Sequence, residues 1–125
     1  MLMLNNCWIE QKDVEALLTS ARILYNEGFV DAALCTATVA SKAHPHWRAY
    51  DQCAVCHMAR GRYLEATRFY AKALKIGGDD IPVDYQIEML TNYHAALQPL
   101  DRPRHVKTIF NKLQKAHLKI RGRVK

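Results

Sequence analysis

The sequence predicts an all-α fold, an antiparallel helix-pair solenoid of about three repeats. Apolar residues recur at helical spacing in six segments, and no segment alternates with period two for long enough to predict a strand. Glycine and proline separate these segments. Small residues also recur at a distance of 33 positions, which indicates an internal repeat.

The composition is typical of one soluble globular domain. The chain has 125 residues, of which 50% are hydrophobic and 24% are charged, and this excludes collagen-like, disordered and disulfide-dense classes. Ser20 and Ser41 are the only serines, and no glycine-rich phosphate loop occurs. We therefore expect a non-catalytic protein, because a serine-nucleophile enzyme or a nucleotide hydrolase lacks its characteristic residues here.

The first two helices follow from local capping and turn signals. Asp13 is suited to cap a helix that runs from 14 to about 26, and Gly28 is suited to end it. A second helix is expected from about 29 to 43. It should stop there because Pro45 disfavours helix in the residue before it.

The remaining four helices are bounded by similar signals. Two of them lie between Pro45 and the glycine pair at 77–78, and the other two begin near Pro82 and Pro103, since proline is favoured in the first helical turn. The four expected ranges are about 46–60, 63–76, 80–97 and 101–118. The last range carries apolar residues at helical spacing, namely Val106, Ile109, Phe110 and Leu113.

The internal repeat is clearest between the first and second helix pairs. Gly28 recurs as Gly61, and Ala33, Ala37 and Ala40 correspond to Ala66, Tyr70 and Ala73. Glycine permits a tight turn between two helices, and alanine lets their backbones approach closely. In a third copy Val106, Phe110 and Leu113 take the corresponding places at an offset of 40, which predicts an insertion at 77–81.

This pattern resembles the tetratricopeptide repeat, whose strongest match is the segment GRYLEATRFYAKAL that begins at Gly61. The resemblance implies a lead-in at 1–13, a helical domain at 14–118 and a basic tail at 119–125. The repeats would span about 14–46, 47–79 and 83–118. It also implies a partner-binding concave face on the first helix of each repeat. The residues at those positions are Leu18, Arg22, Tyr25, Asp51, Val55 and Met58.

A narrower resemblance involves the segment IPVDYQIEMLTNYHAAL that begins at Ile81. It is similar to the N-terminal domain of subunit 7 of the anaphase-promoting complex. The resemblance implies a scaffold subunit of a nuclear ubiquitin ligase that pairs with a second copy of itself. Because a three-repeat stack leaves an apolar face uncovered at each end, we expect a homodimer. The residues expected at its interface are Trp8, Ile9, Leu17 and Leu24.

The charge distribution suggests an alternative function. Residues 1–101 carry nine basic and twelve acidic residues, whereas residues 102–125 carry nine basic residues and no acid. Such a segment favours an adaptor that contacts nucleic acid or an acidic protein through a basic arm. The residues of this arm are Lys115, Lys119, Arg121, Arg123 and Lys125.

The segment Cys53-Ala54-Val55-Cys56-His57 has the spacing of a c-type haem attachment site. Zinc is a second alternative, since His44 and His46 lie nearby in the sequence. We favour packed cysteines and expect neither a cofactor nor a metal, because small side chains suit a helix crossing. The N-terminus does not read as a signal peptide and no run is long enough to span a membrane, so we expect a nuclear or cytoplasmic protein.

Overall fold

The computed structural model describes residues 2–4, 7–9 and 11–123, and side chains from Asp13 to Gly122. Helix dominates this part of the chain, as the sequence predicts. The elements are the strands β1 (Leu2–Leu4) and β2 (Cys7–Ile9), the 3₁₀ turns η1 (Gly78–Asp80) and η2 (Gln98–Leu100), and the helices α1 (Gln11–Asn26), α2 (Val30–Ala43), α3 (Trp47–Ala59), α4 (Tyr63–Gly77), α5 (Val83–Leu97) and α6 (Pro103–Arg123).

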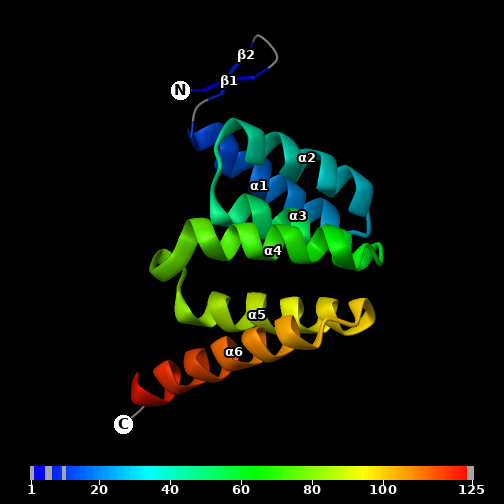
Figure 1. Ribbon diagram of the computed structural model, residues 1–125. Coiled ribbons are helices and arrows are strands. Elements are labelled where there is room, and N and C mark those ends of the chain that lie inside the picture. Colours follow the sequence, from blue (N-terminus) through cyan, green and yellow to red (C-terminus); the bar gives the residue numbers. More distant parts are fainter. Residues whose placement is uncertain (1, 5–6, 10, 124–125) are drawn as a thin grey trace.

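The first nine residues contain a short antiparallel strand pair, in which Met3 lies opposite Trp8. The sequence does not predict this pair. Each strand has only three residues, which is too few for period-two alternation to be recognised. The pair lies beyond the N-terminal end of α1 (Figure 1).

The helices pack in sequence order, so that each helix contacts the next one. Helix α1 also contacts α3. Figure 1 shows the helices as a stack that begins with α1 and α2 and ends with α5 and α6. Two boundaries differ clearly from expectation. The first helix begins at Gln11, so Asp13 lies in its first turn, where its charge favours the helix N-terminus. The last helix continues to Arg123, so residues 119–123 are helical rather than a tail.

The 33-residue correspondence is present in the backbone of the first two hairpins. Gly28 and Gly61 both adopt positive φ, at 91° and 72°. The amide of Phe29 donates to the carbonyl of Leu24 at 2.9 Å, and the amide of Arg62 donates to the carbonyl of His57 at 2.9 Å. The α1–α2 and α3–α4 turns thus repeat the same hydrogen bond 33 residues apart.

The third hairpin has a positive φ at the corresponding position, but with a different residue. Asp101 takes the place of Gly61 and has φ 51°, the only positive value at a non-glycine residue in the described chain. The extra length is not confined to 77–81, however. Helix α5 begins 36 residues after α3, and α6 begins 40 residues after α4. The insertion is therefore divided between η1 and η2. Pro99 could have indicated the second part, because proline marks turns and loops.

The core runs through all six helices but differs in character along the stack. Between α3 and α6 it contains large, fully buried side chains such as Tyr70, Met89 and Leu97. Between α1, α2 and α3 it is built mainly from small residues, among them Ala21, Ala37 and Cys53. Small side chains allow the backbones of crossing helices to approach closely. Within the described residues, no helix is both long and apolar enough to cross a membrane.

Gly77 shows how tight this packing becomes at the end of α4. Its backbone is helical, so no unusual torsion requires glycine there. A Cβ atom at this position would overlap the side chain of Ile81 and lie 2.9 Å from the Cβ of Trp47. Glycine is therefore required by the close approach of these two side chains, both of which are buried.

Candidate functional site

A pocket of about 80 Å³ is lined by the first helix of each hairpin. Four of the lining residues come from α3, three from α1 and one from α5. They are Leu18, Thr19, Arg22, Trp47, Arg48, Asp51, Gln52 and Tyr85. This is the face on which the sequence analysis placed the partner-binding residues.

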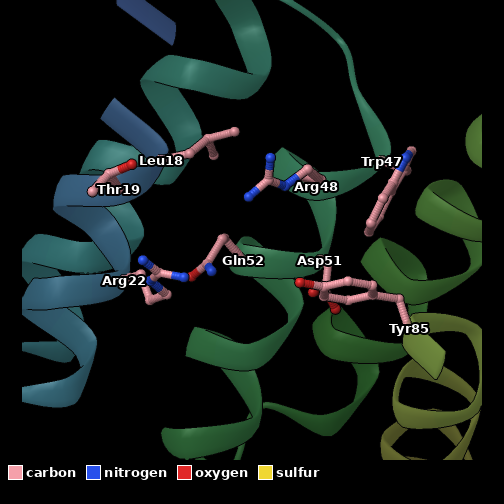
Figure 2. Close-up of a pocket in the computed structure, with 8 residues that line it drawn as sticks. All are labelled: Leu18, Thr19, Arg22, Trp47, Arg48, Asp51, Gln52 and Tyr85. Carbon is pink, nitrogen blue, oxygen red and sulfur yellow. The ribbon is translucent and has the colours of Figure 1, made fainter. Parts of the chain in front are cut away.

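Two cations and two aromatic rings give this pocket its chemistry. Figure 2 shows Arg22 and Arg48 extending toward the same space from α1 and α3, with Trp47 and Tyr85 on the other side. The two rings meet edge to face, with centroids 5.5 Å apart. Among the described residues, neither guanidinium has a hydrogen-bond or ion-pair partner. The donors of both arginines are therefore available to a bound group.

Asp51 is the acidic group of the pocket. Burial is the main reason that its pKa is raised to about 7, and the nearby carboxylate of Glu88 adds to the effect, whereas Arg48 opposes it. The carboxyl group is therefore partly protonated at neutral pH. A protonated carboxyl group can donate as well as accept a hydrogen bond. The pocket thus presents two permanent cations beside a carboxyl group that titrates near physiological pH.

The structure brings together only some of the six residues predicted to bind a partner. Leu18, Arg22 and Asp51 line the pocket. Tyr25, Val55 and Met58 are half-buried and do not line it, and Val55 and Met58 pack against the main core. Whether the three residues that line the pocket bind a partner remains a prediction. The other three residues lie on the same two helices but outside the pocket.

Sequence reasoning missed five of the lining residues. Arg48 and Gln52 could have been found, because Arg48 lies three residues before Asp51 on α3 and Gln52 lies four residues after Arg48. Tyr85 could not, because its approach to Trp47 depends on how η1 places α5 against α3. The remaining two are Thr19 and Trp47.

The residues predicted to form a dimer interface lie at the N-terminal end of the stack. Trp8 and Ile9 belong to β2, and their side chains lie outside the described residues. Leu17 and Leu24 are half-buried on α1, where Leu17 packs against Val14 and its neighbours. Self-association through these residues remains a prediction.

The predicted basic arm is mostly a helix. Lys115 and Lys119 lie on α6 and line a groove beside the end of α4. Arg121 is exposed on the same helix, and Arg123 is its last residue. The side chain of Arg123 and the whole of Lys125 lie outside the described residues.

The cysteines of the haem-like motif occupy packing positions. Cys53 and Cys56 are fully buried, and burial raises the pKa of Cys56 to about 11, which disfavours the thiolate that binds metals. His57 is also buried and stacks on Phe69, with centroids 5.3 Å apart. In the described part of the chain, no group of three histidine, cysteine, aspartate or glutamate residues is arranged to hold a metal ion.

Comparisons with known proteins add no assignment. No protein-family model matches the chain, and no curated protein matches it significantly. The function must therefore be argued from the geometry and chemistry of the surfaces described above.

Proposed function

We propose that this protein is a non-catalytic protein–protein interaction scaffold of the tetratricopeptide type, and that its partner binds at the pocket formed by α1, α3 and α5. The observation that carries the proposal is the origin of the lining residues. Leu18, Arg22, Asp51 and Tyr85 come from the first helices of three successive hairpins. In a helix-pair solenoid these helices form the extended surface that binds partners.

The repeated turns support the tetratricopeptide assignment. Gly28 and Gly61 both have positive φ 33 residues apart, and Asp101 has positive φ in the third hairpin. Each hairpin also packs on the next one, as a quasi-one-dimensional repeat requires. These features belong to the backbone and are independent of the residues that line the pocket.

The size of the pocket favours a protein partner over a metabolite. Small-molecule sites usually enclose roughly 300–1,000 Å³. The volume here is about 80 Å³, so the pocket accommodates a single side chain of a larger ligand. The guanidinium groups of Arg22 and Arg48, which have no partner among the described residues, select for a carboxylate. The rings of Trp47 and Tyr85 offer an apolar edge. We therefore propose a partner segment with an acidic side chain at its point of contact.

The experiment is affinity capture of the full chain with the double variant Arg22→Glu/Arg48→Glu. Proteins that bind through the pocket should be lost, because two attractive charges become repulsive. The matched control is Arg68→Glu/Lys75→Glu, which makes the same charge change at exposed positions on α4. Recovery of the same proteins with wild type and both variants would contradict the proposal. A recovered protein should then be purified and should bind the pocket variant about tenfold more weakly.

The resemblance to an anaphase-promoting complex subunit extends this proposal to a specific assembly. It predicts that the captured proteins are ubiquitin ligase subunits from the nucleus or cytoplasm, and that the chain forms a homodimer. Sedimentation should then show a dimer at micromolar concentration that persists in about 0.5 M salt, because apolar contacts are not screened as exposed charges are. A monomer at every concentration would refute self-association without affecting the pocket.

A further inference from the structure

A second concave surface lies between α6 and the C-terminal end of α4. It encloses about 300 Å³, several times the volume of the pocket on α1, α3 and α5, and shares no residue with that pocket. Its lining consists of Leu74, Gly78, Asp79, Gln86, Leu90, Lys112, Lys115, Ala116 and Lys119. We refer to it as the α4–α6 groove.

The floor of the α4–α6 groove is apolar. Leu74 comes from α4, Leu90 from α5 and Ala116 from α6, so the side chains of three helices converge there. Leu90 and Ala116 are only 4% and 3% exposed, and Leu74 is half-buried. These positions are held by the main core, which fixes the shape of the floor. An apolar side chain of a ligand would lose water against this surface.

One edge of the groove is a row of lysines on α6. Lys112, Lys115 and Lys119 are spaced by three and four residues, so they lie on one helical face over two turns, about 10 Å along the axis. All three are exposed, and none forms an ion pair with another described residue. Helix α6 contains no acidic residue, and among the described residues that line the groove only Asp79 is acidic.

We propose that the α4–α6 groove binds an acidic amphipathic helix of a partner protein. An apolar side chain of that helix would rest on Leu74, Leu90 and Ala116, and its carboxylates would pair with the lysine row. Helices of this kind place carboxylates three and four residues apart along one edge of their apolar face, which matches the spacing of the lysines.

The composition of the groove favours a protein segment over nucleic acid. None of the described residues that line the groove is aromatic, so bases would find no ring there on which to stack. The phosphate backbone would gain nothing from an apolar floor. The lysine row and the floor are used together only by a ligand that carries both carboxylates and an apolar face.

The test uses the full chain and a labelled helical peptide of glutamate and leucine, with two leucines four residues apart, followed by fluorescence anisotropy. We expect micromolar binding that weakens about tenfold in Lys112→Glu/Lys115→Glu. The control Lys107→Glu/Arg121→Glu changes the same helix by the same net charge at exposed positions outside the groove. Circular dichroism should show that both variants keep the helical content of wild type.

A second peptide, in which glutamine replaces both leucines, tests the apolar floor and should bind several-fold more weakly. Equal losses in both charge variants would show general charge attraction and would overturn the proposal. The absence of peptide binding would also overturn the proposal. The same holds if a single-stranded oligonucleotide binds more tightly than the peptide and competes with it. The pocket variant Arg22→Glu/Arg48→Glu should bind the peptide like wild type, which separates this site from the proposed scaffold function.

Discussion

Replacing Asp51 by asparagine tests the electrostatics of the pocket on α1, α3 and α5. The pKa of this carboxyl group is raised from 3.8 to about 7, mainly by burial and then by Glu88. The folded state therefore binds the proton more tightly than the unfolded state does. The contribution of this group to stability is greatest below about pH 4, falls as the pH rises from 4 to 7, and is constant above that range.

The size of the effect follows from the difference between the two pKa values. Each unit corresponds to about 1.4 kcal/mol, so ionisation of Asp51 costs the folded state at most roughly 4 kcal/mol at pH 8. Asparagine has nearly the same shape and does not ionise. We therefore expect Asp51→Asn to raise the free energy of unfolding at pH 8 by about 2–4 kcal/mol and to leave it nearly unchanged at pH 4.

The assay is urea denaturation of wild type and Asp51→Asn at intervals between pH 4 and pH 8. The difference in free energy of unfolding should grow steadily across this range. Asp84→Asn is the control, because Asp84 is exposed on α5, and its effect should stay within about 0.5 kcal/mol. An Asp51→Asn protein that is less stable than wild type at pH 8, or a difference that does not change with pH, would refute the reasoning.

Two further predictions concern packing, and thermal or urea denaturation checks both. Gly77→Ala should lower stability by about 1–3 kcal/mol because its Cβ meets Ile81 and Trp47, whereas Gly122→Ala, with open space around it, should raise stability by up to about 1 kcal/mol. Equal shifts for the two variants would contradict this account. Ala66→Trp should cost several kcal/mol at a fully buried helix crossing, while the exposed control Arg68→Trp should cost about 0.5 kcal/mol or less. A wild-type melting temperature for Ala66→Trp would argue against the repeat alignment.

The helices could be predicted from the sequence because their signals are local. The apolar spacing within each helix and the turns at Gly28 and Gly61 act over a few residues, and these boundaries differ from the structure by little. The start of α1 and the end of α6 were harder to place, because no strong boundary signal marks either position. The strands β1 and β2 are too short to leave a recognisable pattern.

The candidate site was only partly predictable, for a different reason. Leu18, Arg22 and Asp51 were found because helical position alone decides which face they occupy. Trp47 and Tyr85 enter the pocket through an interhelical contact that depends on the placement of α5. Of the α4–α6 groove, only Lys115 and Lys119 were predicted, as part of the basic arm, since a stretch rich in lysine does not reveal that another helix supplies an apolar floor beside it.

The uneven core also has a consequence for the dynamics of the chain. Because the main contacts join helices adjacent in sequence, contact order is low, and local opening of one hairpin need not disrupt the others. The hairpin of α1 and α2 is held mainly by alanines, whereas α3 to α6 share large buried side chains. The backbone amides of the α1–α2 hairpin should therefore exchange with solvent first. Since α1 supplies Leu18 and Arg22, a ligand in that pocket should slow exchange most strongly in the hairpin that opens most readily.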